Sequence, residues 1–390
     1  MKKNITLISI ATILIISVVV ASYVLLIMPK QEKETLAEKV SKLEQGEKYE
    51  TATVSTDNWD TENRVNIVYD TANVPVPVPK GYVASGVDGE HTVNTGFVIY
   101  EGTEEVNDSN KEEAQKTRNQ WVWVPVENPN DIYGTDSQGK KHGKLYEFSS
   151  SGKAAKNWTE NNGVMNITSS TSYREPDILT SYDYDSYMPY YITEETRNNI
   201  NKELKENFEM TIESIEKYGG FYIGRYETGG LNGAAKVVRG DTNISNQRWY
   251  TMYEKSKELR GNNSNVRTSM IWGFQWDATL EWLVKSGSKT YSEVGSDSSS
   301  WGNYRDNTVT GHGSRQATGY SEVWKANNIY DMAGNVWDLT LEAYNTYYRV
   351  LRGGGYYRNG GSSPADDRDD DSPSLTDGYY GTRAILYVAL

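Results

Sequence analysis

The chain has 390 residues, a net charge of −13 and no cysteine. Without thiols the protein forms no disulfide, zinc–thiolate centre or cysteine nucleophile, and the acidic balance argues against nucleic acid as a partner. Hydrophobic residues make up 37% of the chain, enough for a packed core, and its aromatic residues are mainly 30 Tyr and 11 Trp. Tyr and Trp combine a large apolar body with a polar group, so they suit partly exposed surfaces as well as cores.

An uncharged apolar run extends from Ile5 to Met28, after Lys2 and Lys3. About 20 apolar residues can cross a bilayer as a helix, and the preceding positive charge favours a cytoplasmic N-terminus. We therefore expect residues 1–29 to be a single-pass anchor in a bacterial cell membrane, with the large domain on the extracytoplasmic side. A cleaved signal segment and a type IV prepilin leader are the alternatives, and the latter would make the chain a pilus-like structural subunit.

Residues 30–72 are charged or polar, and we expect them to form a stalk and linker. Leu36, Val40 and Leu43 have helical spacing within the stalk. The main domain is expected over residues 73–390. Its first segment, VPVPVPKGY, is typical of an edge strand because proline cannot donate to a strand ladder.

The rest of the main domain shows both helical and strand patterns. A helix is predicted from 194 to 218, with an apolar face made of Ile200, Leu204, Phe208, Ile212 and Ile215. Further patterns predict strands at 96–102, 120–126 and 219–230, and helices near 249–259 and 275–285. The polar segments 103–118, 127–190 and 286–318 are expected to be irregular, the first two as long insertions. The mixture indicates an α+β fold.

Near the C-terminus a segment rich in Tyr, Ser, Gly and Asp separates two apolar stretches. We expect these stretches, Arg349 to Arg352 and Ala384 to Val388, to be buried strands that hold its ends. Tyr with Ser and Gly is the composition of antibody binding loops, although the acidic run DDRDDD would also suit a solvated loop. The residues that we expect to contact a ligand are Tyr356, Tyr357, Arg358, Asn359, Asp366, Asp367, Arg368, Asp369, Asp370, Asp371, Tyr379 and Tyr380.

Three segments together resemble the formylglycine-generating enzyme, or sulfatase-modifying factor, family. They are FYIGRYET (221–228), NIYDMAGNVWDLT (328–340) and RVLRGG (349–354) with the closing GTRAILYV (381–388). SMIWGFQWDATLEWL (269–283) lies where that family has a tryptophan-bearing helix. The resemblance covers residues 74–390 and implies a C-type lectin-like fold. The chain departs from the family pattern at Thr382, where the family has Phe, and at Gly355, where it has Ser.

The resemblance implies no copper site in this chain. The family's enzymes oxidise a substrate cysteine with two copper-binding cysteines, and those positions correspond to Arg358 and Ser363, which cannot act as copper thiolates. Related iron-dependent enzymes of the family need a histidine cluster, whereas the three histidines here are far apart in the sequence, at His91, His142 and His312. We therefore expect the chain not to be an enzyme.

The resemblance also implies a structural calcium ion within DMAGNVWD (331–338). Its ligands would be the side chains of Asp331 and Asp338 and the backbone carbonyls of Gly334 and Val336. Hard oxygen ligands of this kind suit Ca²⁺. An ordinary turn, whose aspartates bond to the backbone, is the alternative.

These observations predict a membrane-anchored, extracytoplasmic protein that binds a protein or glycan through residues 349–390, on a catalytically inactive scaffold. Variable proteins of diversity-generating retroelements resemble this arrangement, because they place a hypervariable region rich in Tyr, Asp, Ser, Gly and Asn at the C-terminus of a lectin-like scaffold. Diversification of residues 349–390 is therefore a hypothesis. The alternative is an enzyme, either a divergent member of the sulfatase-modifying factor family or an unrecognised hydrolase.

Overall fold

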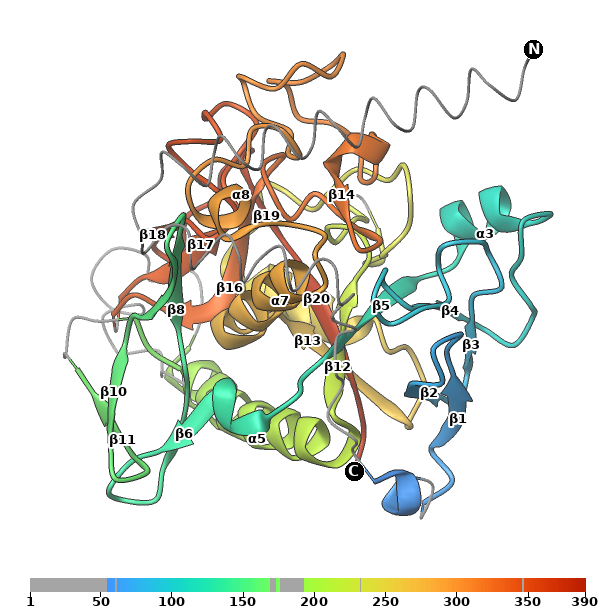
Figure 1. The fold of residues 1–390 in the computed structure, drawn as a ribbon. Coiled ribbons are helices and arrows are strands. Elements are labelled where there is room, and N and C mark those ends of the chain that lie inside the picture. Colours follow the sequence, from blue (N-terminus) through green and yellow to red (C-terminus); the bar gives the residue numbers. More distant parts are fainter. Residues whose placement is uncertain (1–54, 60–61, 169–172, 176–192, 232, 346) are drawn as a thin grey trace, which may run out of the picture. The chain divides into compact units, whose positions relative to one another are not determined.

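The computed structural model describes residues 55–59, 62–168, 173–175, 193–231, 233–345 and 347–390. These residues form helices and several sheets (Figure 1), which confirms the predicted α+β class. The lectin-like arrangement that the resemblance implied stays a prediction.

The largest sheet has six strands, and every neighbouring pair is antiparallel. Its order is β13-β20-β12-β5-β4-β3. Strands β5, β12 and β20 are buried along their whole length, as expected for interior strands with nearly continuous apolar sequences. In sheet order the strands are β13 (Val266–Met270), β20 (Ala384–Val388), β12 (Gly220–Gly224), β5 (Gln120–Pro125), β4 (Val98–Glu101) and β3 (Tyr82–Ala84).

A second sheet has four strands in the order β18-β17-β16-β19. Only its β16–β19 pair is parallel. The strands are β16 (Trp337–Ala343), β17 (Arg349–Arg352), β18 (Arg368–Asp371) and β19 (Tyr380–Thr382). The stretches RVLR and AILYV are therefore buried strands, as predicted, but they belong to different sheets. The C-terminal segment leaves the four-stranded sheet at β17, returns to it twice, and then enters the six-stranded sheet as β20.

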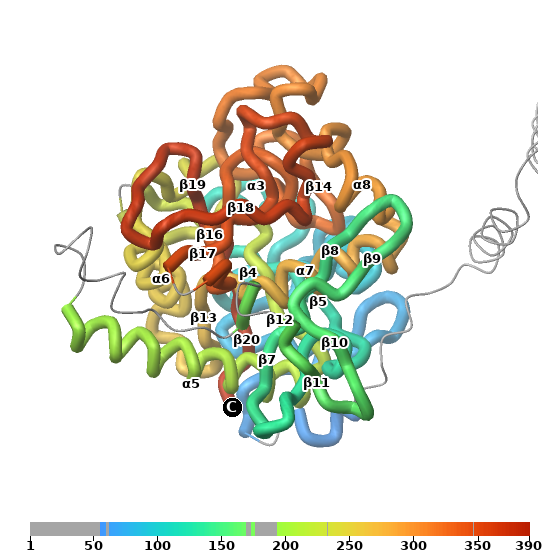
Figure 2. The backbone as a smooth tube through the Cα atoms, turned by 90° about the vertical axis from the view of Figure 1, so that its left-hand side faces the viewer, coloured from blue at the N-terminus to red at the C-terminus, as the bar shows by residue number. Residues whose placement is uncertain are grey.

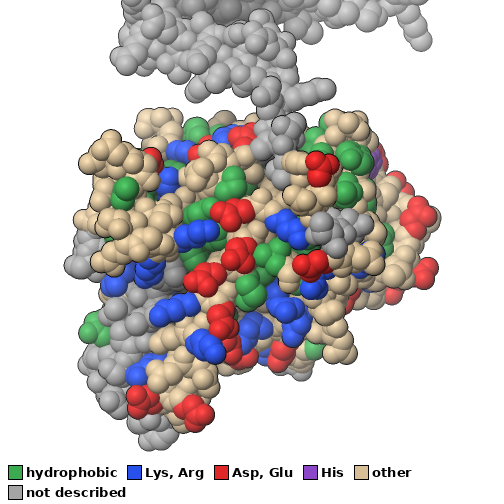
Figure 3. Space-filling model, turned by 90° about the horizontal axis from the view of Figure 1, so that it is seen from below, with side chains coloured by type: hydrophobic (Ala, Val, Ile, Leu, Met, Phe, Trp, Pro, Cys, Tyr) green, Lys and Arg blue, Asp and Glu red, His purple; other side chains and the backbone are tan. Residues whose placement is uncertain are grey.

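Helix α5, Glu194–Tyr218, has the bounds that its apolar spacing predicted. Thr193 caps its N-terminus by accepting a hydrogen bond from the amide of Thr196 at 3.1 Å, and Gly219 ends it with a left-handed φ of 76°. The predicted apolar face is buried, and the helix packs against β12 and β20. Figure 3 views the side on which α5 lies in Figure 1, where acidic and basic side chains are interspersed.

Two further helices also pack on the two sheets. Helix α6 lies against β13, and α7 contacts both β5 and β16, so it links the six-stranded sheet to the four-stranded one. Their bounds, with those of two shorter helices, are α6 (Trp249–Glu258), α7 (Gly273–Lys285), α3 (Lys111–Thr117) and α8 (Tyr291–Gly295). Single 3₁₀ turns occur at Thr56–Asn58, Pro129–Asp131 and Glu322–Trp324.

The insertion at 127–190 is not wholly irregular, contrary to the prediction. Its described part contains three two-stranded hairpins (Figure 2): β6 (Tyr133–Thr135) with β7 (Lys141–Gly143), β8 (Tyr146–Ser149) with β9 (Gly152–Ala155), and β10 (Trp158–Asn161) with β11 (Val164–Ile167). Such short strands carry too few apolar residues for a period-2 pattern to emerge. Another short pair, β14 (Lys325–Ala326) and β15 (Ile329–Tyr330), precedes β16.

The packed domain begins before residue 73. Strand β1 (Val65–Tyr69) pairs with β2 (Pro75–Pro79), and the side chain of Trp59 is buried in the core. The indole of Trp59 donates to the carbonyl of Lys217 at 2.8 Å. Part of the predicted linker therefore belongs to the fold, whereas the predicted stalk helix lies outside the described residues.

The single-pass membrane localisation predicted from the sequence is corrected by the structure. In the described ranges, from residue 55 onward with their gaps, no helix combines the length and apolarity needed to cross a bilayer. The predicted anchor, Ile5 to Met28, lies outside these ranges.

Two buried arginines and two buried acids join α7 to the four-stranded sheet. Arg352 contacts Asp277 at 2.5 Å and Glu342 at 3.1 Å. Arg368 contacts the other oxygens of the same acids, at 2.6 and 2.7 Å. Because each carboxylate is shared by both arginines, the four charges compensate one another away from water, while Nε of Arg352 has no hydrogen-bond partner among the described residues. Arg368, predicted to contact a ligand, is therefore a core residue; we call these four side chains the arginine–acid network.

Residues of the insertion at 127–190 also form hydrogen bonds to the arginine–acid network. The backbone amide of Tyr146 donates to Asp277 at 2.8 Å, and its carbonyl accepts from Arg368 at 2.7 Å. Nearby, Asp366 accepts from the amide of Phe148 at 2.8 Å, and burial raises the pKa of Asp366 to about 6. Asp366 was also predicted to contact a ligand, but it holds strand β8 instead.

A third acid, Glu175, lies at the N-terminus of α7. Its carboxylate accepts from the amides of Gly273 and Phe274, the latter at 2.9 Å. Glu342 lies beside it. Burial, followed by the charge of Glu342, raises the pKa of Glu175 well above its usual range.

Replacing Arg368 by Met should lower the free energy of unfolding by about 3–5 kcal/mol, because Asp277 and Glu342 would stay buried with half of their partners gone. The matched control is Arg358→Met, whose side chain is 46% exposed and whose loss should change stability by less than about 0.5 kcal/mol. Denaturant unfolding followed by tryptophan fluorescence gives both values. Equal losses would contradict the structural role of Arg368.

Glu175 should make the stability depend on pH. Because its pKa is raised in the folded state, its contribution is complete below the ordinary value of 4.5 and is lost as pH rises through the folded pKa. The melting temperature of the wild type should therefore fall more steeply above pH 4.5 than that of Glu175→Gln. Glu209→Gln, on the exposed side of α5, is the control and should follow the wild type. Parallel curves for wild type and Glu175→Gln would exclude this role.

Candidate functional site

Three tyrosine rings gather at the surface of the C-terminal segment. Tyr356 and Tyr357 follow β17, whereas Tyr379 directly precedes β19. The ring centroids lie 5.7 Å apart for Tyr356 and Tyr357, 5.6 Å for Tyr356 and Tyr379, and 4.4 Å for Tyr357 and Tyr379. Residues distant in sequence meet because β17 and β19 flank β16 in the same sheet. We call these three residues, with Arg358, the tyrosine surface.

The turn that carries the first two tyrosines is rigidly built. Gly353 and Gly354 have positive φ of 87° and 78°, and a Cβ on Gly354 would lie 2.4 Å from the carbonyl oxygen of Ser363, so only glycine fits there. The amide of Tyr356 donates to the carbonyl of Asn335 at 2.9 Å. The indole of Trp337 donates to the hydroxyl of Tyr357 at 3.1 Å. The backbone is therefore anchored while Tyr356 and Tyr357 remain partly exposed and Tyr379 is 40% exposed.

Charged side chains of both signs surround the rings. The guanidinium of Arg358 lies 5.1 Å from the ring centre of Tyr357 and 4.0 Å from Asp369. Arg315 donates to the carbonyl of Gly378 at 3.3 Å. A large aromatic centre with a mixed polar rim is the usual composition of a protein-binding surface.

Several predicted contact residues are engaged within the fold instead. Asn359 accepts from the side chain of Arg305 at 3.0 Å. The hydroxyl of Tyr380 donates to Asp371 at 2.5 Å, and burial, with this bond, raises the pKa of Tyr380. Asp370 is partly buried beside two other aspartates, and burial raises its pKa. The structure thus brings together four of the predicted residues as the tyrosine surface, and it places Asp366 and Arg368 in the core.

The predicted calcium ligands Asp331 and Asp338 are both buried. Among the described residues, Oδ1 of Asp331 and both oxygens of Asp338 have no hydrogen-bond partner. Arg383 lies 3.5 Å from Asp338. Burial raises the pKa of Asp331 to about 6 and that of Asp338 to about 7. Unpartnered carboxylate oxygens in a dry site are costly, so the arrangement fits a bound cation.

A third acid, Glu227, lies beside these two, and sequence reasoning missed it. Its carboxylate accepts from the amide of Val336 at 3.2 Å and from the side chains of Asn243 and Asn335 at 2.8 and 2.6 Å. Glu227 therefore bonds to the 331–338 turn at Asn335 and Val336, and its oxygens are occupied by these donors. Its position in the segment FYIGRYET, which carries the family resemblance, was the signal that could have identified it. In the part of the chain that the structure describes, no group of three or more His, Asp or Glu is arranged to hold a metal, so a calcium ion would depend on two carboxylates and backbone carbonyls.

The residues at the family's copper positions and the three histidines have separate surroundings. Arg358 is exposed, whereas Ser363 is buried. The three histidines have separate local partners: His91 the carbonyl of Val87, His142 the carboxylate of Asp136, and His312 the carbonyl of Tyr304.

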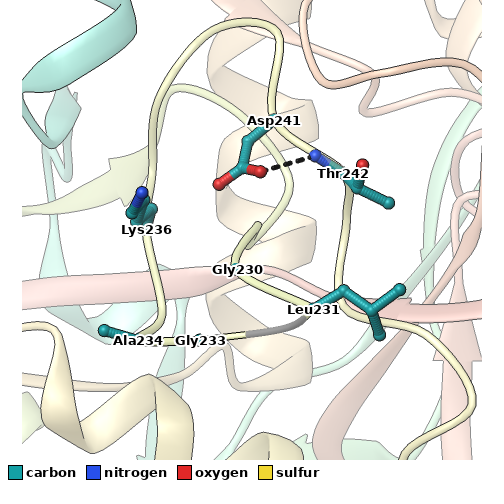
Figure 4. Close-up of a pocket in the computed structure, with 7 residues that line it drawn as sticks. All are labelled: Gly230, Leu231, Gly233, Ala234, Lys236, Asp241 and Thr242. Carbon is teal, nitrogen blue, oxygen red and sulfur yellow. Dashed lines mark hydrogen bonds between the residues drawn. The ribbon is translucent and has the colours of Figure 1, made fainter.

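A pocket of about 270 Å³ lies in the loop after β12. Its walls are mainly glycine and small side chains, and Figure 4 shows Asp241 and Lys236 on separate segments of this loop. Asp241 accepts from the amide of Thr242 at 2.7 Å. The pocket offers one carboxylate and one amine and no aromatic side chain, so the tyrosine surface is the stronger candidate for a binding site.

Comparisons with known proteins agree with the resemblance in the C-terminal part. A similar solved structure is PvdO from Pseudomonas aeruginosa, which is 14% identical; the match covers 44% of this chain and 82% of PvdO, with a TM-score of 0.33. CarF is also 14% identical; the match covers 44% of this chain and 87% of CarF, with a TM-score of 0.30. Treponema denticola variable protein 1 is another, at 14% identity; the match covers 65% of this chain and 98% of that protein, with a TM-score of 0.25. TM-scores this low do not establish a common fold, and no curated protein matches the sequence. Residues 268–388 match the family model described as "Sulfatase-modifying factor enzyme 1-like domain", so this part of the chain is similar to that family.

Proposed function

We propose that the protein binds a macromolecular ligand through the tyrosine surface and that its sulfatase-modifying-factor-like domain serves as a scaffold without enzyme activity. The observation that carries this proposal is the three-ring cluster of Tyr356, Tyr357 and Tyr379, which is held by buried backbone yet open to solvent. Rings buried in a core contribute to stability. A partly exposed cluster on a fixed backbone instead offers contact area to a ligand, and it loses little conformational entropy when the ligand binds.

The anchoring of both ends supports a preorganised surface. The network around Arg352 and Arg368 fixes β17 and β18 to α7. Strand β19 is fixed through Thr382, whose hydroxyl donates to the carbonyl of Leu339 at 3.0 Å. Fixed ends reduce the freedom that the loop loses when a ligand binds.

The scaffold role rests on the sequence. Copper chemistry of the kind implied by the resemblance needs thiolates, and the chain has no cysteine. A divergent enzyme is the second candidate, favoured by the family-model match over residues 268–388. Turnover of a cysteine-containing peptide by the purified protein with added copper would decide for the enzyme.

Diversification of residues 349–390 stays a prediction, consistent with their composition. The side chains of Asp366 and Arg368 are buried and bonded, whereas those of the tyrosine surface are at least partly exposed and should tolerate variation better. Sequences of related strains should therefore differ at 356–358 and 379 and keep Asp366 and Arg368.

Replacing Tyr356 and Tyr379 together by Ala should weaken ligand binding by a factor of about 30 or more, since central tyrosines typically contribute 2 kcal/mol or more to an interface. The probes are binders selected against the wild-type domain from a displayed peptide library and from a glycan array. The control is Tyr69→Ala, which removes an equally large tyrosine, 54% exposed, from strand β1.

Binders that discriminate against the double variant but accept Tyr69→Ala support the proposal, provided that both variants melt like the wild type. Binders that accept both variants equally would show that the ligand contacts another face.

We also propose a calcium ion at Asp331 and Asp338, with the carbonyls of Gly334 and Val336 as further ligands. The unpartnered oxygens of the two aspartates support it, since Arg383 supplies only one positive charge to a group of three acids.

Calcium should therefore raise the melting temperature of the wild type, by several degrees at a concentration 100 times the dissociation constant, which corresponds to about 2.7 kcal/mol. Asp338→Asn should abolish most of this rise, while Asp306→Asn, on an exposed loop, should leave it unchanged. A melting temperature that is the same with calcium and with chelator would exclude the site.

A further inference from the structure

Strand β18 is an edge strand with an unusual sequence. It lies at the end of the four-stranded sheet and pairs only with β17 among the described strands. Its sequence is Arg-Asp-Asp-Asp, preceded by Asp367 and followed by Ser372. Edge strands in general present unpaired backbone groups to which another chain can add a strand.

The pairing shows which amides point outward. Val350 of β17 lies opposite Asp370, and the carbonyl of Val350 accepts from the hydroxyl of Thr340 on β16. The backbone groups of Val350 therefore face β16, away from β18. Since neighbouring residues alternate in direction, the amides of Arg368, Asp370 and Ser372 point to the open edge, whereas those of Asp369 and Asp371 point to β17.

Each outward amide is already bonded to the aspartate that precedes it. The amide of Arg368 donates to Asp367 at 2.9 Å, that of Asp370 to Asp369 at 2.9 Å, and that of Ser372 to Asp371 at 2.7 Å. Three consecutive outward donors are thus satisfied by one repeated contact. Such local bonds compete directly with a strand ladder.

Two of these aspartates also have a contact through their second oxygen. Oδ2 of Asp371 accepts from the hydroxyl of Tyr380 at 2.5 Å. Oδ2 of Asp369 lies 4.0 Å from Arg358. These contacts give Tyr380 and the acidic run a role that needs no ligand.

We propose that the aspartates of β18 close this edge to strand addition and so keep two copies of the chain apart. The occupant that they exclude is β18 of a second copy, because every copy presents the same edge and two identical antiparallel edges meet about a two-fold axis. In the wild type such a pair would lose its caps and bring acidic side chains opposite one another, which is unfavourable. The inference does not depend on the proposed function.

Two double variants test this inference. They distinguish the hydrogen bonds that the aspartates accept from the outward amides from the negative charge of the aspartates. Asp369→Val with Asp371→Val removes both, whereas Asp369→Asn with Asp371→Asn removes the charge and keeps an oxygen that can cap. Sedimentation equilibrium over a range of concentrations measures self-association of each variant and of the wild type. We expect the valine variant to associate at least tenfold more tightly than the wild type, and the asparagine variant to stay close to it, because the caps survive.

A third variant locates the contact. Adding Asp370→Pro to the valine pair removes the central outward amide, which an edge strand tolerates, and should abolish the association. A natively folded valine variant that associates no more than the wild type would overturn the proposal, as would association that survives Asp370→Pro.

A single substitution covers the case in which the valine pair does not fold. In Asp369→Val, hydrogen exchange at the amide of Asp370 should accelerate about fivefold, the equivalent of one hydrogen bond, while exchange at Ser372 stays unchanged. An unchanged rate at Asp370 would show that the cap does not form.

Discussion

The arginine–acid network is the constraint on which the rest of the C-terminal half depends. Asp277 and Glu342 each divide their two oxygens between Arg352 and Arg368, and all four side chains are buried. A buried pair of this kind adds little stability over apolar packing, but a single missing partner leaves an uncompensated charge. The network therefore joins α7, β16, β17 and β18 to one another. The positions of the tyrosine-surface residues depend on these contacts, because the residues follow β17 and precede β19.

The elements that could be predicted from the sequence are those with long, regular patterns. Helix α5 shows a continuous apolar face, a threonine cap and a terminal glycine, and its bounds were predicted correctly. The strands β6 to β11 were missed because each has only three or four residues, too few to show an alternating pattern. Their positions depend on distant partners, such as Asp366 for Phe148 and Asp277 for Tyr146, which no local pattern reveals.

The candidate site was predicted in part, for a related reason. Tyrosines on both sides of the acidic run indicated a shared surface, and three of the four meet there. Tyr380 does not join them, because its hydroxyl donates to Asp371 of strand β18. Arg368 and Asp366 were placed at the surface because charged residues usually lie there. Their burial depends on Asp277 and on Phe148, far away in the sequence.

Strand β20 has a consequence for how the chain is made. It lies between β13 and β12, so both neighbours hydrogen-bond to residues that the ribosome adds after them. Until Val388 has left the exit tunnel, β12 and β13 have no common partner, and the centre of the six-stranded sheet stays open. Non-local pairing of this kind is slow and leaves apolar strands exposed meanwhile. The nascent chain should accordingly leave one edge of β12 and of β13 unpaired until β20 has emerged from the ribosome.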